Sequence, residues 1–504
     1  MSFSRINSRA KRGVDAPEVV IEVHISNGLP GFQIVGLAET SVREARDRVR
    51  SAIINSQFKF PQTKITVNLA PADLKKEGGR FDLPIAIGIL AATGQLRADK
   101  LHDFEFYGEL GLKGDIRAII GEIPTAIQCA KLGRTCVLPE SNAQQASVIS
   151  NIKLLATNNL LSLYQQLNGQ DLELYVDMQQ AEDNGLHPVN HQDLNDVIGQ
   201  AAAKRALAIA AAGSHNLLFV GPPGTGKSML AQRMTTIMPT MTEQEALETA
   251  AIYSICGKPV TASNLFERPF RSPHHTCSGV ALVGGGSSPR PGEISLSHNG
   301  ILFLDELPEF DRKVLDVLRE PMETGSVCIS RASQQAEFPA RFQLVAALNP
   351  SPTGSIDDGR MTHDQILKYL NKISGPFLDR IDLQVDVPTL PKGTLTASTN
   401  NEVSSAEIKA HVFAARELML RRQGKANALL SNKELNQFCP LTEADSEFLE
   451  STLEKLKMSI RAFHRIIKVA RTIADLEQCE EIKRVHLSEA LSYRALERLI
   501  RRIS

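Results

Sequence analysis

The sequence predicts an α/β protein in three parts, with a parallel-sheet core between an N-terminal α+β domain and a C-terminal helical lid. Apolar strands separated by long crossovers run from about 193 to 390, which is the pattern of a parallel sheet covered by helices. A polar, turn-rich segment at 171–192 separates this core from a mixed domain at 1–170, and a second polar break opens the linker and helical lid at 391–504. The length of 504 residues is sufficient for about three domains.

The composition indicates an ordinary globular protein without a general affinity for nucleic acid. The chain has 56 Lys and Arg against 57 Asp and Glu, a net charge of −1. This balance excludes a protein that covers nucleic acid with a uniformly basic surface. It does not exclude a local basic surface, because the net charge does not show how the charges are distributed. Aromatic residues make up 5% and Trp is absent, which argues against a platform of many stacked rings for nucleic-acid bases.

Targeting and redox signals favour a cytoplasmic protein. No run approaches ~18 consecutive apolar residues, so we expect no membrane span. The charged N-terminal stretch has no apolar segment behind it, so no secretory signal is expected. Seven cysteines are scattered without a C-x-x-C pair, which is typical of reduced thiols in a cytosolic protein.

Strand and helix patterns alternate in the N-terminal domain. A helix is expected over 41–56, where Val42, Ala45, Val49 and Ile53 recur with helical spacing. The segments expected to form strands are 19–28, 32–37 and 64–71. In the last of them Ile65, Val67 and Leu69 alternate with polar residues, as in a strand with one buried face.

The strongest motif is a Gly-rich loop between a strand and a helix. An apolar strand over 217–220 leads into Gly221, Pro222, Pro223, Gly224, Thr225, Gly226, Lys227 and Ser228, and a helical pattern follows. Glycines let backbone N–H groups turn towards phosphate oxygens, and the helix N-terminus adds positive potential. Lys227 can neutralise the β- and γ-phosphates of a nucleotide, and the Ser228 hydroxyl can ligate Mg²⁺.

Two further strands end in polar residues that complete such a site. Asp305 and Glu306 follow the apolar run 301–304; Asp305 is expected to hold Mg²⁺ through water and Glu306 to polarise the attacking water. Asn349 ends the strand FQLVAALN and could bind that water or the γ-phosphate. The less favoured alternative for Asn349 is a simple turn residue before Pro350.

The C-terminal region is expected to be helical to its end. Thr442 and Asp445 have the spacing of a capping box at a helix start. The run from Ser459 to Glu477 is amphipathic, and its expected buried face comprises Ile460, Phe463, Ile467, Ala470 and Ile473.

Four long motifs in this order give the chain a family resemblance. They read HNGILFLDEL, FPARFQLVAALNP, SGPFLDRIDL and SIRAFHRIIKVARTIADL. The set resembles the magnesium-chelatase-like branch of the AAA+ ATPases, and within it the ComM (YifB-like) family, in which a Lon-protease-like domain precedes the ATPase. The resemblance implies ATP and Mg²⁺ as cofactors and a ring, expected to be hexameric, with the nucleotide between subunits.

The same resemblance assigns two arginines. It implies that Arg380 is an arginine finger that completes the neighbouring subunit's site. It implies that Arg461, at the start of the lid helix, senses the γ-phosphate. From the sequence alone, a surface ion pair is the favoured interpretation of each arginine, because arginines are abundant in the chain. Many relatives carry cysteines after the sensor asparagine, whereas this chain has none between Asn349 and Cys439, so no structural zinc is expected.

The N-terminal domain resembles the proteolytic domain of Lon but lacks its catalytic residues. A Lon-type peptidase uses a serine nucleophile and a lysine base. Here the turn at 77–82 reads EGGRFD without a serine, and the position matching the lysine, near 121–124, carries none. Proteolysis is therefore not expected, and the domain is interpreted as an assembly or nucleic-acid-binding module.

Two insertions in the core are the expected DNA contacts. The first, from about 268 to 298, carries Arg268, Arg271, His274, His275 and Arg290; the second is a hairpin beginning at Gly325 with Arg331 near its tip. Such basic loops on a neutral protein suit phosphate contacts in a central pore. Local hydrogen bonding is the alternative for the two histidines.

The combined interpretation is an ATP-driven ring that translocates on DNA. The resemblance implies branch migration during homologous recombination of incoming DNA in natural transformation, on single-stranded, forked or three-stranded substrates, with a recombinase as a possible partner. The alternative is the motor subunit of a magnesium-chelatase-type complex or another protein-remodelling ATPase.

Overall fold

The computed structural model describes most of the chain and divides it into two compact units. The described residues are 2–36, 39–97, 99–169, 174–175, 192–286, 289–331, 334–356, 359–391, 403–456 and 458–503. The N-terminal unit comprises Met1–His187, Glu243–Phe266 and Ser330–Phe338, and the P-loop unit comprises Pro188–Thr242, Glu267–Ile329 and Pro339–Ser504. Glu243–Phe266 thus groups with the N-terminal unit, although the sequence analysis counted it in the core. Nearly all of the expected linker 171–192 lies outside the described residues.

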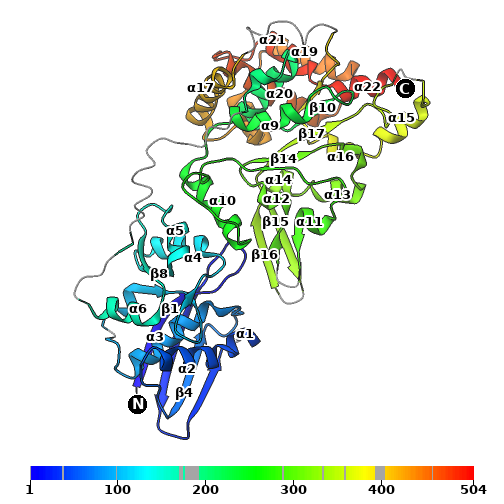
Figure 1. Ribbon diagram of the computed structural model, residues 1–504. Coiled ribbons are helices and arrows are strands. Elements are labelled where there is room, and N and C mark those ends of the chain that lie inside the picture. The colour runs from blue at the N-terminus through cyan, green and yellow to red at the C-terminus, as the bar shows by residue number, and fades with distance from the viewer. Residues whose placement is uncertain are drawn as a thin grey trace. The chain divides into compact units, whose positions relative to one another are not determined.

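The N-terminal unit is built on a mixed seven-stranded sheet with the order β3-β4-β2-β1-β5-β8-β9 (Figure 1). Its strands are β1 (Ser2–Arg9), β2 (Glu18–Ser26), β3 (Gly31–Val35), β4 (Lys64–Ala70), β5 (Phe104–Phe106), β8 (Thr135–Pro139) and β9 (Lys153–Thr157). The pairs β1–β2 and β2–β4 are antiparallel, and the other neighbours are parallel. The three strands expected from the sequence are present as β2, β3 and β4.

Helices pack on this sheet. The helices of the unit are α1 (Thr40–Arg43), α2 (Ala45–Asn55), α3 (Asp82–Ala92), α4 (Glu122–Lys131), α5 (Glu140–Ala146), α6 (Leu160–Asn168) and α10 (Glu243–Ile255). Helix α3 is apolar all round, as expected for a helix enclosed in a core, and it packs on β1, β2 and α2. The apolar residues predicted for the 41–56 helix and for β4 are all buried, which confirms both patterns.

The P-loop unit contains a five-stranded parallel sheet with the order β11-β14-β17-β10-β18. Its strands are β10 (Leu217–Val220), β11 (Phe270–Arg271), β14 (Ile301–Leu304), β17 (Gln343–Leu348) and β18 (Leu383–Asp386). Strands β10, β14 and β17 are buried along their whole length, as expected for a parallel sheet covered on both faces. This order places the carboxyl ends of β10, β17 and β14 side by side.

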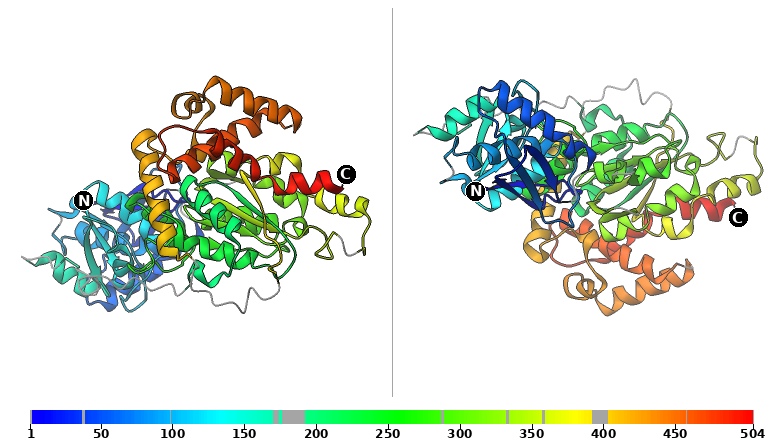
Figure 2. Two further views of the ribbon diagram at one scale, coloured as in Figure 1. Left: turned by 90° about the horizontal axis from the view of Figure 1, so that it is seen from above. Right: turned by 90° about the horizontal axis from the view of Figure 1, so that it is seen from below.

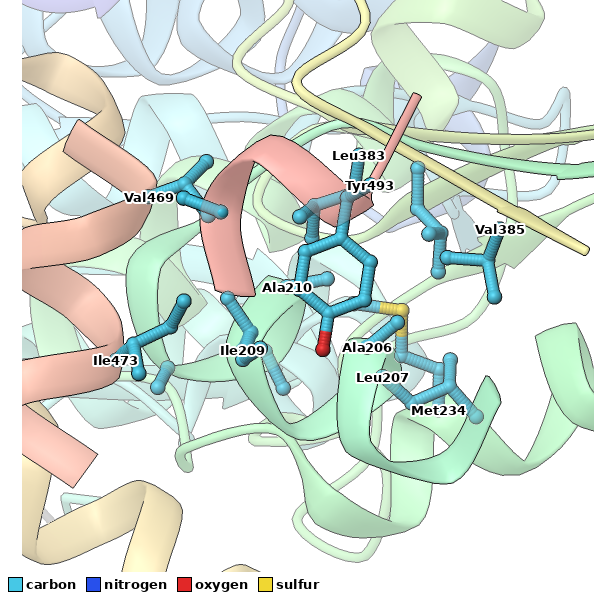
Figure 3. Packing of buried hydrophobic residues seen from close by; sticks show 14 of the residues in the cluster. Ala206, Leu207, Ile209, Ala210, Met234, Leu383, Val385, Val469, Ile473 and Tyr493 are labelled. Carbon is cyan, nitrogen blue, oxygen red and sulfur yellow. The ribbon is translucent and has the colours of Figure 1, made fainter. Parts of the chain in front are cut away.

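Helices from the C-terminal region pack beside this sheet (Figure 2). They are α17 (Ser405–Gln423), α18 (Asn432–Phe438), α19 (Glu443–Lys455), α20 (Ile460–Leu476), α21 (Arg484–Ser492) and α22 (Ala495–Ile503). Helices α17 and α20 contact α8 (Ala201–Gly213), and α17 also contacts α9 (Lys227–Ile237). Figure 3 shows Tyr493 among side chains of α8, α9 and β18, including Leu207, Met234 and Val385.

The predicted lid helix is present as α20, but the prediction that its first residue, Ile460, is buried is wrong. Ile460 is 79% exposed because it is the first residue of α20, ahead of the turns that pack. Ile467, Ala470 and Ile473 are buried as predicted. The cap at Thr442 is confirmed in part: its hydroxyl accepts the Asp445 N–H at 3.2 Å, and the carboxylate accepts the hydroxyl proton instead of bonding the backbone.

Both insertions of the core contain short paired segments. The first comprises α11 (Gly279–Val283), the antiparallel pair β12 (Gly284–Gly285) and β13 (Arg290–Pro291), and α12 (Glu293–Leu296). The second is a hairpin of β15 (Ser326–Arg331) and β16 (Gln334–Pro339). Along the chain, α13 (Arg312–Val317) and α14 (Pro321–Thr324) lie between β14 and β15. Helices α15 (His363–Leu370) and α16 (Gly375–Leu378) lie between β17 and β18. Among the described residues, none of the helices combines the length and apolar character that a bilayer crossing needs.

A buried ion pair joins two helices of the N-terminal unit. Asp82, the first residue of α3, is fully buried and accepts hydrogen bonds from Arg48 Nε at 2.7 Å and Nη2 at 3.0 Å. It also accepts the Leu110 N–H at 3.2 Å. Burial raises the pKa of the Asp82 carboxyl to about 6 even though Arg48 favours the charged form. The desolvation of this carboxylate is therefore only partly offset by its partner.

Replacing Arg48 by Met is expected to lower the free energy of unfolding by about 3–5 kcal/mol at pH 8, because a buried carboxylate loses its cation. The folded pKa of Asp82, about 6, lies above its ordinary value of 3.8. Stability therefore falls as the pH rises through this interval, and the variant raises the folded pKa further. The loss should shrink at pH 5, where the carboxyl is protonated.

Urea unfolding followed by circular dichroism at both pH values measures this effect. The double variant Arg48→Met/Asp82→Asn removes the charge as well and should recover most of the loss. An equal loss at pH 8 and pH 5 would contradict the assignment.

Candidate nucleotide-binding site

The Gly-rich loop leaves the carboxyl end of β10 and enters α9. Gly224 and Gly226 have φ values of +76° and +89°, a region that residues with a side chain adopt only under strain. Gly221 is needed for a different reason: a Cβ there would lie 2.2 Å from the carbonyl oxygen of Val387. The glycines thus set both the course of the loop and its close fit against the chain after β18.

Lys227 is directed back into this loop. Its Nζ donates to the carbonyl oxygens of Gly221 and Pro222, both at 2.7 Å, and to Asn349 Oδ1 at 3.0 Å. The residue is 7% exposed, and burial lowers the pKa of its ammonium, while Asp305 and Glu306 act in the opposite direction. The structure therefore brings together the loop lysine and the asparagine at the end of β17.

Ser228 and Asp305 form the second pair of the site. The Ser228 hydroxyl donates to Asp305 Oδ2 at 2.7 Å, which joins the first turn of α9 to the carboxyl end of β14. A hydroxyl and a carboxylate this close are hard oxygen ligands of the kind that Mg²⁺ takes in nucleotide sites. The donor set therefore fits the expected Mg²⁺, with Ser228 and Asp305 as the residues that would hold it.

Glu306 lies next to this pair with its side chain half exposed. Its backbone has a φ of +52°, and its N–H donates to Asp305 Oδ1 at 2.9 Å. Its Oε2 lies 3.4 Å from Nδ1 of His275, in the loop after β11. The His275 ring also packs against that of His274, with centroids 4.1 Å apart. Sequence reasoning placed His275 in an insertion but missed it as the partner of Glu306.

The two arginines assigned by resemblance are in different settings. Arg380 follows α16; its Nη2 contacts Glu323 of α14, its Nη1 donates to the Pro376 carbonyl at 2.5 Å, and its side chain is 10% exposed. Arg461 lies in the first turn of α20 and is exposed. Within the described part of the chain, no hydrogen bond or ion pair joins either residue to Lys227, Ser228 or Asp305. Their roles toward a nucleotide remain predictions.

The arginines of the insertions are used unequally. Arg268 donates to the carbonyls of Pro239 and Asn299, each at 2.6 Å, and so supports the chain locally. Arg271 forms a bidentate pair with Glu293, at 2.6 and 2.8 Å. Arg290, on β13, is exposed. The side chain of Arg331 lies outside what the structure describes. Arg290 is thus the described arginine of this set most accessible to a DNA phosphate, and all four contacts remain predictions.

The segments that match the Lon catalytic turn and lysine region meet through an arginine. Arg80 is buried and donates to the Ile120 carbonyl at 2.6 Å and to the Arg9 carbonyl at 3.3 Å. At the start of α4, the Ile123 N–H donates to the Ser254 hydroxyl at 3.2 Å. These groups satisfy one another's hydrogen bonds within the unit, which is a structural use of the region.

One cluster in the described residues has metal-ligand residue types: Glu477, Cys479 and His486, whose ligand atoms lie within 4.8 Å of one another. His486 Nδ1 accepts the Lys483 N–H at 3.0 Å, so the proton of a neutral ring is on Nε2, which faces Glu477 at 3.1 Å. Arg205 also binds Glu477, at 2.9 Å. The cluster is therefore better described as a hydrogen-bonded ion pair than as a metal site.

Comparison with known families gives three matches along the chain. Residues 193–395 match the family described as magnesium chelatase, subunit ChlI. Residues 21–142 match subunit ChlI of Mg-chelatase, and 402–494 match its C-terminal region.

Individual relatives extend this result to the full length. The chain is 54% identical to the competence protein ComM of Haemophilus influenzae over 100% of both chains. It is 51% identical to YifB of Salmonella typhimurium over 99% of this chain and 98% of that one. A more distant similarity, 22% over 58% of this chain and 33% of the other, links it to the maternal DNA replication licensing factor mcm6 of Xenopus tropicalis. Because full-length identity of this degree accompanies all three family matches, the chain belongs to the ComM/YifB family of magnesium-chelatase-like proteins.

Proposed function

We propose that this protein is a Mg²⁺-dependent ATPase of the AAA+ type that works as a ring on DNA. The observation that carries the ATPase proposal is the convergence of Lys227, Ser228, Asp305 and Asn349 at the carboxyl ends of three adjacent parallel strands. Ligands of open α/β sheets bind at this edge, and a loop opening a helix is suited to phosphate.

In the proposed reaction each side chain has a distinct task. Lys227 exchanges its present oxygen partners for the β- and γ-phosphates, and Ser228 and Asp305 hold the metal. Bound Mg²⁺ supplies a Lewis acid that neutralises charge on the phosphate oxygens. Glu306, once released from His275, orients and polarises the attacking water, and Asn349 binds that water or the γ-phosphate.

The site is proposed to be completed by a second subunit. Arg380 would deliver positive charge from the neighbour to the transferred phosphoryl group, and Arg461 would sense the γ-phosphate. The support is the family membership, together with the finding that, among the described residues, no hydrogen bond or ion pair joins either arginine to Lys227, Ser228 or Asp305. A hexamer is the proposed stoichiometry.

DNA is the proposed substrate of the motor. One full-length relative is named a competence protein, and the distant one a DNA replication licensing factor. The exposed Arg290 and the hairpin carrying Arg331 provide basic loops on a chain with a net charge of −1. We propose that the ring drives branch migration during recombination of incoming DNA in the cytoplasm, and that its Lon-like domain is a non-proteolytic module.

The alternative follows from the family matches to ChlI: a motor subunit of a chelatase-type complex or another protein-remodelling ATPase. An ATPase assay with single-stranded, duplex and forked DNA separates the two. Stimulation by DNA supports the DNA motor, whereas stimulation only by a protein partner or a porphyrin supports the alternative.

The variants Lys227→Ala and Glu306→Gln are expected to fail in different ways. Lys227→Ala should lose ATP binding, because no other side chain of the loop carries a positive charge. Glu306→Gln should bind ATP and hydrolyse it roughly a hundredfold or more slowly, because the Ser228–Asp305 pair is kept while the base is lost. Binding of a fluorescent ATP analogue and phosphate release measure the two defects. Glu309→Gln, an exposed acid nearby, is the control, and hydrolysis by Glu306→Gln at the wild-type rate would refute the role.

Arg380→Ala should leave ATP binding nearly intact and lower hydrolysis on the order of a thousandfold. If the arginine acts on the neighbour, mixing with Lys227→Ala should restore activity, because some interfaces then pair an intact loop with an intact arginine. Phosphate release across a series of mixing ratios is the measurement. No recovery at any ratio would argue against a shared site.

Arg290→Ala and Arg331→Ala should keep basal ATPase and ring formation but lose DNA stimulation and strand displacement on a three-stranded junction. Each lost phosphate contact should lower the salt slope of DNA binding by about one. Fluorescence anisotropy at several salt concentrations measures the slope. Arg421→Ala, an exposed arginine of α17, is the matched control. Normal unwinding by intact rings of both variants would remove these loops from the DNA path.

A further inference from the structure

A single asparagine connects the start of the P-loop strand to the segment that carries Arg380. Asn216 precedes β10, which lies between β17 and β18 in the sheet. Its Nδ2 donates to the carbonyl oxygen of Arg380 at 2.9 Å. Its Oδ1 accepts the N–H of Leu344, in β17, also at 2.9 Å. One amide group therefore bridges the chain on both sides of β10.

The backbone of the same residue holds the following residues of that segment. The Asn216 carbonyl accepts the N–H groups of Asp382 and Leu383, both at 3.1 Å. Its own N–H donates to Asp382 Oδ2 at 3.3 Å, and His215 Nδ1 lies at the same distance from that oxygen. Three residues of the stretch from Arg380 to Leu383 are thus hydrogen-bonded to Asn216: Arg380, Asp382 and Leu383.

We propose that Asn216 is a positioning residue for Arg380, fixing the point from which the arginine reaches the neighbouring subunit's nucleotide. This proposal rests on the proposed role of Arg380. The side chain of Arg380 has only labile anchors of its own, an ion pair with a Glu323 that is 60% exposed and one carbonyl, and its Nε has no hydrogen-bond partner among the described residues. The hydrogen bond from the Asn216 side chain to the Arg380 backbone carbonyl is an anchor that does not depend on the guanidinium.

The chemistry of the contact requires an amide. The Arg380 carbonyl needs a donor and the Leu344 N–H needs an acceptor, and an asparagine side chain supplies both at once. Aspartate is nearly isosteric but has no proton for the carbonyl, and its charged oxygen would face the Arg380 carbonyl oxygen. Alanine supplies neither bond. A catalytic group displaced by about 1 Å can lose roughly a hundredfold in rate.

The position of Asn216 also links two different active sites. The P-loop begins at Gly221, at the carboxyl end of β10, and Asn216 stands at the amino end of the strand, about 16 Å away for five residue steps along an extended chain. The P-loop serves the subunit's own nucleotide, whereas Arg380 is proposed to serve the neighbour's. A buried strand with partners on both sides therefore joins the two catalytic contributions of one subunit as a rigid connection.

The test is complementation in mixed rings of the full-length protein. Asn216→Asp and Asn216→Ala should bind ATP normally and lower kcat about a hundredfold, with little change in the KM for ATP. Mixing either with Lys227→Ala should restore phosphate release, as for Arg380→Ala, because the P-loop of the Asn216 variant is intact and its partner supplies a well-placed arginine. The double variant Asn216→Ala/Arg380→Ala should be no slower than Arg380→Ala alone, because both changes act through one group.

A matched control separates positioning from general loss of stability. Asn142 of α5 is also buried, and its amide likewise makes two bonds: it accepts the Ile119 N–H at 2.8 Å and donates to the Ile119 carbonyl at 3.0 Å. Asn142→Ala should destabilise the chain, and activity it loses should not be recovered by mixing with Lys227→Ala.

The outcomes are distinguishable. If Arg380→Ala is complemented but both Asn216 variants are fully active, or inactive without complementation, the inference is overturned and the proposed function stands. If Arg380→Ala itself is not complemented, the proposal that two subunits share the nucleotide site is refuted, and the inference about Asn216 is refuted with it. Complementation of Arg380→Ala and of Asn216→Asp, without that of Asn142→Ala, supports the inference.

Discussion

The register of three parallel strands is the constraint on which the candidate site depends. Val220 of β10 pairs with Leu348 of β17, and Leu304 of β14 pairs with Ala346 of the same strand. Each polar residue follows directly: Asn349 stands beside the start of the Gly-rich loop, and Asp305 stands one strand further on. A slip of one residue would move a strand by about 3.3 Å and turn its side chains to the opposite face. The Lys227–Asn349 and Ser228–Asp305 contacts could not survive such a slip.

The interior of this sheet explains why the register is well defined. Strands β10, β14 and β17 are apolar and buried on both faces, and apolar side chains alone do not strongly distinguish one register from the next. Polar contacts at the amino ends provide the distinction. Gln343 donates from β17 to the carbonyls of Ala210 and His215, at 2.8 and 2.5 Å, and Asn216 bonds both of its flanking strands. Hydrogen bonds at one edge of the sheet thus fix the geometry of the site at the other edge.

Features formed by residues that are contiguous in the sequence could be predicted. Contacts between side chains that depend on the path of a loop could not. The Gly-rich loop, Asp305 and Asn349 each follow an apolar strand, so their place at one sheet edge follows from the parallel order. The strands and helices of the N-terminal unit were visible for the same local reason. The contact of His275 with Glu306 and the pairing of Arg271 with Glu293 depend on the course of an insertion, which no periodicity encodes. Arg268 was predicted to contact DNA, yet its side chain donates to the carbonyls of Pro239 and Asn299 in the same subunit. Asn216 carries no motif at all.

The N-terminal unit contains buried charged side chains that hold one another in place. Arg9 binds Glu105 through two donors at 2.8 and 2.9 Å, Arg134 binds the same carboxylate at 2.9 Å, and Tyr107 also contacts it. Arg80, which is also buried, donates to the backbone carbonyls of Arg9 and Ile120. Removing one member of such a network leaves an unpaired buried charge, which costs more than the pair itself contributes. The network is therefore held by its own energetics and needs no catalytic role to be kept. A domain stabilised in this way is suited to be a rigid module of an assembly, because its buried charged side chains are engaged with one another and with backbone carbonyls.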